Sequence, residues 1–161
     1  GKLFSSGGYP SNAFDGSVTT TIALGNPGCY FGVDLGLHSR ALLHEVRIYP
    51  DYNEAHRIVN GKIEGSVDGV NYITIGSVGS REQEGWNSVH ISGIAAQNLV
   101  ANASTIPFRF LRFAGHSTSS CHLAELEFLG YTVAAETDRA RFNGAGVSCN
   151  ITVATSEPSV S

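Results

Sequence analysis

The sequence has few charged residues, no long apolar run and no basic cluster, and these absences exclude several classes of protein. Charged residues make up 15% of the 161 residues, below the roughly 25% of an average soluble domain. The formal net charge is −4, and no run of Lys and Arg offers the basic surface that nucleic-acid binding requires. No apolar run approaches the roughly 20 residues of a membrane span. We therefore expect no nucleic-acid partner and no membrane-spanning helix.

Catalytic and zinc-binding motifs are also missing from the sequence. It contains no GxSxG, HExxH, P-loop or GxGxxG pattern. Glu125 and Glu127 lie two apart in an apparent strand, which separates them by about 7 Å, but no cleft is evident around them. The three cysteines are Cys29, Cys121 and Cys149, and no CxxC or paired His at ligand spacing accompanies them. We expect a non-enzymatic protein with one disulfide and one free or intermolecular thiol.

Short apolar runs separated by turn residues make up most of the sequence. Hydrophobic residues make up 42% of the chain, and Gly occurs 19 times. Polar and apolar residues alternate in several of the runs, as half-buried strands require. Asp68-Gly69 is a strong hairpin signal. The expected strands are residues 30–35, 42–49, 61–67, 72–78, 86–91, 108–113 and 123–129. This pattern predicts an all-β, antiparallel sandwich or barrel, whereas residues 1–21 are rich in turn formers.

The composition changes after Gly130, which suggests a domain boundary. We expect a sandwich over residues 1–131 and an extension, linker or start of a following module over 132–161. Residues 134–141 fit a linker or a short helix, residues 147–153 fit another strand, and the Ser/Pro/Glu tail fits a frayed end. Two sequons, Asn102-Ala103-Ser104 and Asn150-Ile151-Thr152, favour an extracellular glycoprotein, secreted or at the cell surface.

Five motifs in order resemble the discoidin family, the coagulation factor 5/8 C-terminal domains. They resemble an early N-A-x-D-G turn, a V-D-L-G strand, a G-S-x-D-G hairpin, an F-R-Y-V-R strand and a closing A-E-I-E-F-x-G strand. The matching segments are residues 12–20, 31–36, 63–72, 108–113 and 124–130. The resemblance covers about three quarters of the chain. It implies a jelly-roll-like β-sandwich of the galactose-binding-like superfamily, which includes the family 32 carbohydrate-binding modules.

The resemblance implies a lectin-like module that binds glycans or glycoproteins through loops at one end of the sandwich. An alternative function is protein interaction or cell adhesion through the same loops. A further alternative, phospholipid binding, requires protruding apolar residues ringed by basic ones. Trp86 is the sole Trp and has an acidic neighbour, Glu84, so we expect it to pack in the core or a hairpin rather than to enter a membrane.

A structural calcium ion is implied for the first loop. Asp15 stands in an Asp-Gly turn that offers a carboxylate, hydroxyls and carbonyls, and calcium takes about six to eight oxygen ligands. By the resemblance, the ligands are Asn12, Asp15, Ser17, Thr20, Ala124 and Glu125. Ser17 stands where the family usually has Asn or Asp. The alternative is an Asx-turn at Asp15 with a solvated Glu125 at a strand edge.

Three loops are candidates for the sugar-binding face: residues 26–30, 50–57 and 115–122. Arg, Asn, His and Tyr suit this role, because sugars present vicinal hydroxyls and an apolar C–H face. The candidate ligand residues are Arg57, Tyr52, Asn53, Tyr30 and His116. Arg57 is the first choice, because the relatives carry an Arg in this loop. Alternatively, Arg57 pairs with Glu54 or Asp51, Tyr30 packs in its strand, and His116 is a plain loop residue.

The resemblance also places Cys29 and Cys121 in loops at one end of the sandwich. A Cys29–Cys121 disulfide is therefore expected, and it would stiffen both loops in the usual entropy account. Cys149 would then be left over. Galactose-binding relatives often have a His at the position of Cys29, so the chain departs from the pattern for galactose, and the sequence does not name the glycan.

Overall fold

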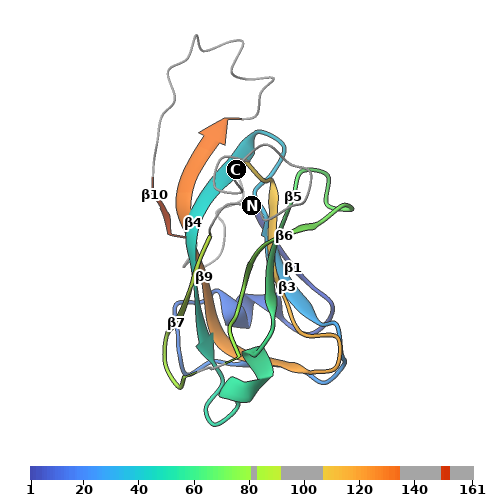
Figure 1. Ribbon diagram of the computed structural model, residues 1–161. Coiled ribbons are helices and arrows are strands. Elements are labelled where there is room, and N and C mark those ends of the chain that lie inside the picture. The colour runs from blue at the N-terminus through green and yellow to red at the C-terminus, as the bar shows by residue number, and fades with distance from the viewer. Residues whose placement is uncertain (81–82, 92–106, 135–149, 153–161) are drawn as a thin grey trace.

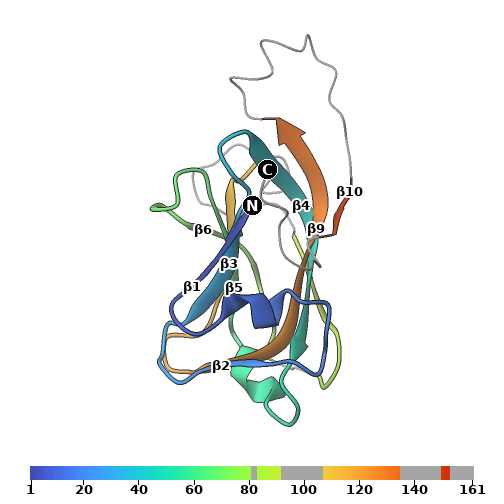
Figure 2. The same cartoon turned by 180° about the vertical axis from the view of Figure 1, so that it is seen from behind.

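The computed structural model shows a β-sandwich of two antiparallel sheets, which confirms the predicted fold class. The structure describes residues 1–80, 83–91, 107–134 and 150–152, without the side chains of the last three. One sheet has the strand order β1-β3-β8-β5-β6, and the other has the order β10-β9-β4-β7, with β2 paired to β9. Figures 1 and 2 show the two layers face to face.

The sheets are built from short strands, with two long ones at the centre of the second sheet. The elements are β1 (Lys2–Ser5), the 3-10 helix η1 (Pro10–Ala13), β2 (Ile22–Leu24), β3 (Tyr30–Asp34), β4 (Ser39–Pro50), the 3-10 helix η2 (Ala55–Ile58), β5 (Lys62–Ser66), β6 (Ile73–Ser77), β7 (Asn87–His90), β8 (Phe110–Ala114), β9 (Cys121–Ala134) and β10 (Asn150–Thr152). No helix among the described residues is long and apolar enough to cross a membrane.

Alternation along the strands determines which side chains enter the core. In β4, Val46 and Ile48 are buried, whereas Arg47 between them is half-buried on the outer face. In β8, Leu111 and Phe113 are buried on either side of Arg112. Successive side chains of a strand point to opposite faces, so this pattern gives each sheet one apolar face. The core lies between these two faces.

Two strands, β1 and β2, were not among the strands expected from the sequence. β1 pairs with β3, with Lys2 opposite Asp34, and β2 pairs with β9, with Ile22 opposite Leu123. Both strands are too short to show a period of their own, because four and three residues contain at most two alternations. β1 was therefore absent from the expected strands, although it lies in the segment that is rich in turn formers.

The expected Asp68-Gly69 hairpin is present between β5 and β6. The Asp68 carboxylate accepts hydrogen bonds from the backbone N–H groups of Val70 and Asn71, each at 2.8 Å. These bonds, with the Asn71 side chain and Ser66, hold the pKa of Asp68 well below its usual range. Gly69 has a φ of 79°, which a residue with a Cβ rarely adopts.

Part of the expected extension, residues 132–161, belongs to the second sheet. β9 runs on to Ala134, and β10 pairs with it, with Ile151 opposite Gly130. Residues 135–149, which contain Cys149 and most of the expected linker or helix, lie outside the described residues. The Asn102 sequon lies outside them as well.

Candidate functional site

The three candidate loops meet at one end of the sandwich. We define the loop rim as residues 25–30, 51–58 and 115–122. Gly115 N–H donates to the Cys29 carbonyl at 2.8 Å, which joins the first and third loops. Arg57 Nη1 donates to Ser120 Oγ at 2.5 Å, which joins the second and third. In Figure 1 the rim is at the lower end, around the green η2, and Gly1 lies toward the opposite end.

A disulfide between Cys29 and Cys121 clamps two of these loops together. The bond is present, spans 92 residues of sequence, and both cysteines are fully buried. Gly115 packs against it, and a Cβ at this position would clash with the Sγ of Cys121. The cross-link therefore holds two loops of the rim together from a buried position and takes up none of the rim's outer surface.

Arg57 connects the second loop to the third instead of extending freely into solvent. Its Nε donates to Glu54 Oε2 at 2.8 Å, so the ion pair expected as the alternative role is present. The hydrogen bond and charge of Arg57 lower the pKa of Glu54. About a third of the Arg57 side chain is exposed. The guanidinium is thus held in one orientation by Glu54 and Ser120 and still reaches the surface, which suits a preorganised donor.

Tyr52 and Asn53 form the exposed tip of the second loop. Tyr52 is 80% exposed, an arrangement that leaves its ring free to contact a ligand. Asn53 has a φ of 59°, in the left-handed region that Asn tolerates better than most residues. Glu54 N–H donates to the Asp51 carbonyl at 2.9 Å and closes the turn. The backbone conformation therefore explains why position 53 is Asn, whereas it does not explain why position 52 is Tyr.

Tyr30 and His116 are less available than Tyr52. Tyr30 lies in β3 beside Phe4, with ring centroids 6.1 Å apart. Its ring therefore packs against a neighbouring strand, which was the alternative to ligand contact. His116 Nδ1 lies 2.8 Å from Thr118 Oγ1, and its carbonyl accepts from Ser119 N–H at 3.0 Å. Both contacts are within the third loop, and they shape that loop.

Two rim contacts were not predicted from sequence. Ser120 receives the Arg57 hydrogen bond, and His122 Nδ1 lies 3.9 Å from Asp51 Oδ2. Both residues belong to a segment that the sequence did mark as a candidate loop. Their partners are more than 60 residues away in sequence, and no local pattern encodes such a pairing.

The expected calcium loop brings Asp15 and Glu125 together. Gly16 N–H donates to Glu125 Oε2 at 3.1 Å. Glu125 is 1% exposed, and its Oε1 is buried without a hydrogen-bond partner in the part of the chain that the structure describes. Burial and the nearby charge of Asp15 raise the pKa of Glu125 to about 7. The alternative of a solvated Glu125 is therefore wrong.

The other expected ligands in the first loop make hydrogen bonds within that loop. Asp15 Oδ1 accepts from Ser17 N–H at 2.8 Å, so the Asx-turn of the alternative is present. Ser17 Oγ lies 2.9 Å from Thr19 Oγ1 and accepts from Thr20 N–H at 3.3 Å, which occupies it within the loop. Asn12 Nδ2 donates to the Thr21 carbonyl at 3.1 Å.

A bulge in β9 marks the second half of this site. Leu123 lies opposite Pro50 and Glu125 lies opposite Tyr49 in β4, which leaves Ala124 as the extra residue. A bulged residue is left out of the ladder and re-aims its neighbours. Among the described residues, no cluster of three His, Cys, Asp or Glu side chains could hold a metal ion. Any cation here would depend on the two carboxylates with backbone and hydroxyl oxygens, and the unpartnered Glu125 Oε1 fits that donor set.

Comparison with known proteins connects this fold to carbohydrate-binding modules. No family model matches the chain, and no curated protein matches it in sequence. Among solved structures, it is similar to the module CBM62 of Clostridium thermocellum Xyl5A, with a TM-score of 0.68, 23% identity, and coverage of 81% of this chain and 94% of that one.

Two family 32 modules give similar values. The module CBM32-6 of a Clostridium perfringens protein has a TM-score of 0.59, 16% identity, and coverage of 80% of this chain and 92% of that one. The CBM32 of AlyQ, in complex with 4,5-unsaturated mannuronic acid, has a TM-score of 0.59, 19% identity, and coverage of 79% and 92%. These likenesses confirm the β-sandwich fold that the five motifs implied.

Proposed function

We propose that the chain is a non-catalytic carbohydrate-binding module whose ligand docks on the loop rim. The observation that carries the proposal is the presence of an exposed aromatic ring and a held guanidinium in the same loop of the rim. Tyr52 is 80% exposed, and Arg57 is fixed by Glu54 and Ser120 in the adjoining turn. A tyrosine ring offers an apolar surface to the C–H face of a sugar, and Arg donates to neighbouring hydroxyls.

The similar structures support the same ligand class. The AlyQ module was solved with an unsaturated mannuronic acid, and a chitosan-binding module of Paenibacillus sp. IK-5 was solved with chitotriose. Both have the fold of this chain at TM-scores of 0.59 and 0.56. Binding without catalysis agrees with the missing catalytic motifs in the sequence.

We propose in addition that a structural calcium ion binds between the first loop and β9. Asp15 and Glu125 would supply carboxylate oxygens, with further oxygens from Asn12, Thr20 and Ala124. The buried, unpartnered Glu125 Oε1 supports this proposal, because a divalent cation would neutralise two adjacent carboxylates that otherwise repel. Ser17 would have to release its contacts within the loop to serve as a ligand.

An extracellular location completes the proposal. The buried Cys29–Cys121 disulfide supports it, because disulfides persist in oxidising compartments. The glycans would then belong to an extracellular matrix, a cell surface or a glycoprotein.

A glycan array probed with the full chain, with and without a chelator, tests the binding function. We expect signals for a chemically related group of glycans. Binding to protein baits or liposomes, together with an empty array, would favour the adhesion or phospholipid alternative and contradict the proposal. For the ion, we expect added calcium to raise the melting temperature of chelator-treated protein. An unchanged melting temperature would contradict the calcium site.

A further inference from the structure

A hollow on the outer face of the first sheet lies apart from the loop rim. It has a volume of about 220 Å³ and is lined by Lys2, Phe4, Asp34, Gly69, Tyr72 and Phe110. Asp34 ends β3, whereas the rim lies at the Tyr30 end of that strand. The hollow is thus a separate site that the proposed function does not use.

Aromatic rings from several strands form the walls of this hollow. Phe4 and Phe110 are in edge contact, with ring centroids 6.4 Å apart. Phe4 can lie across β3 because Gly32 is opposite it, and a Cβ at Gly32 would clash with the Phe4 ring and the Leu111 carbonyl. Gly69 closes over the ring of Phe110 in the same way. The glycines therefore make room for rings on a sheet surface that is otherwise polar.

Two arginines hold these rings in place. The guanidinium of Arg112 lies 3.6 Å from the centroid of the Tyr72 ring, and its Nη2 pairs with Glu64 Oε2 at 2.7 Å. Arg109 lies 4.6 Å from the centroid of Phe110. Cation–π contacts of this kind are favourable, and each arginine is itself fixed by a carboxylate, so the ring walls are preorganised.

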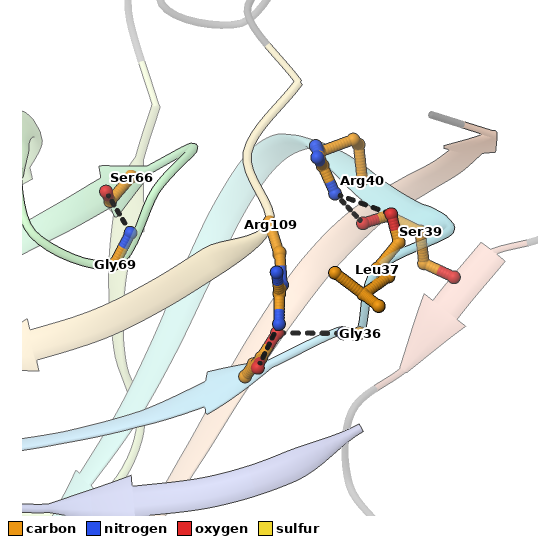
Figure 3. Close-up of polar contacts among 8 residues, drawn as sticks. Gly36, Leu37, Ser39, Arg40, Ser66, Gly69 and Arg109 are labelled. Carbon is orange, nitrogen blue, oxygen red and sulfur yellow. Dashed lines mark hydrogen bonds and ion pairs between the residues drawn. The ribbon is translucent and has the colours of Figure 1, made fainter. Parts of the chain in front are cut away.

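The carboxylate of Asp34, which lines the hollow, is paired with Arg109. Arg109 Nε donates to Asp34 Oδ1 at 2.6 Å, and its Nη2 donates to Oδ2 at 2.7 Å. Figure 3 shows Arg109 directed toward the turn at Gly36, with the Ser66–Gly69 contact of the β5–β6 hairpin nearby. Lys2 is exposed and has no ion-pair partner among the described residues. Lys2 is therefore the lining residue whose charge is available to a ligand.

We infer that this hollow is a second carbohydrate site that takes one acidic sugar ring, a uronic acid. The ring walls would contact the apolar face of the pyranose, and Lys2 would pair with its carboxylate. A volume of about 220 Å³ is below the roughly 300–1,000 Å³ of sites for drug-sized ligands, which fits one ring. The site shares its ligand class with the proposed function but depends on none of the loop-rim residues.

Titration of the ¹⁵N-labelled full chain with galacturonate, followed by amide NMR, tests this site. We expect saturable shifts at the amides of Gly69, Tyr72 and Phe110, and weaker ones with the neutral sugar galactose. Lys2→Gln should weaken galacturonate binding about fivefold, as expected for loss of an exposed ion pair worth up to about 1 kcal/mol. Lys62→Gln is the matched control, because Lys62 is an exposed lysine on the same sheet face, and it should have no effect.

Several outcomes would overturn the inference. They are no saturable shift at these three amides, an equal response to galactose, or full affinity in Lys2→Gln. The variant Arg57→Ala separates this inference from the proposed function. It should leave the shifts at Gly69 and Tyr72 unchanged, and a loss of those shifts would contradict a separate site.

Discussion

At the scale of single residues, Glu125 is the most unusual group in the described structure. Its carboxyl group is 1% exposed, one oxygen accepts from Gly16 N–H, and the other oxygen has no partner in the described chain. A buried carboxylate without full pairing is destabilised in its charged form, which is the cause of its raised pKa. The residue therefore couples the stability of the fold to both protons and cations.

We predict a pH dependence of stability that follows from Glu125. Its pKa rises from an ordinary 4.5 to about 7 in the folded protein, so the folded state holds this proton more tightly than the unfolded state does. The contribution is complete below about pH 4.5 and is lost as the pH rises through about 7. Chelator-treated protein should therefore lose unfolding free energy across this window, as measured by urea denaturation.

Glu125→Gln supplies the control, because glutamine keeps the shape and does not titrate. The variant should show a flatter pH profile between about pH 4.5 and 7 than the wild type. Calcium should stabilise the wild type more at pH 8 than at pH 5, since the ion binds the charged carboxylate. An identical pH profile in the two proteins would show that Glu125 is not the titrating group.

At the scale of elements, the disulfide and the strand ends fix the loop rim. The Cys29–Cys121 bond joins the residue before β3 to the first residue of β9, and Gly115 packs directly on it. The disulfide thus fixes the first and third loops of the rim to the sandwich. The turn at Tyr52 in the second loop is exposed.

Replacing Gly115 with alanine should test how tightly the rim is packed. A Cβ there would clash with Sγ of Cys121, and overpacking typically costs about 1–3 kcal/mol. Gly25→Ala is the matched control from the same rim, because a Cβ at Gly25 has no atom within 4 Å. Denaturation midpoints should fall for Gly115→Ala and stay constant for Gly25→Ala. Equal midpoints would mean that the disulfide region is loosely packed.

Removing the disulfide should have a larger effect. It closes a loop of 92 residues, and the loop-entropy account gives about 4.6 kcal/mol for this length. The double variant Cys29→Ala/Cys121→Ala should lose unfolding free energy of this order in urea denaturation. A loss below about 1 kcal/mol would show that the cross-link adds little to what the sheets supply.

The sequence predicted the elements that alternate and missed those defined by their partners. β4 and β8 were expected because polar residues interleave with apolar ones in residues 46–49 and 108–113. β1 was missed because its four residues become a strand only by pairing with β3. Asp15 and Glu125 were expected to meet because family motifs tied them together, whereas the Arg57–Ser120 contact depends on the folded positions of two loops. The outer-face hollow was missed for the same reason, since its rings come from β1, β8 and the β5–β6 hairpin.

At the scale of the whole molecule, the sandwich separates two surfaces of different character. The loop rim carries Arg57 and the exposed Tyr52. The opposite end carries the turn between β3 and β4, where Arg40 Nη1 donates to the Ser39 carbonyl at 2.9 Å (Figure 3). A variant at one end should therefore leave the other end intact, because the sheets between them form a continuous core.

The most direct test of the central claim is calorimetric titration of the best-binding glycan from the array into the wild type, Arg57→Ala and Arg40→Ala. Loss of charged hydrogen bonds to a ligand costs about 1.5–3 kcal/mol, so affinity should fall about 10- to 100-fold in Arg57→Ala. Arg40→Ala should bind like the wild type, and all three should melt at similar temperatures. Undiminished affinity in a folded Arg57→Ala protein would contradict glycan recognition at the loop rim.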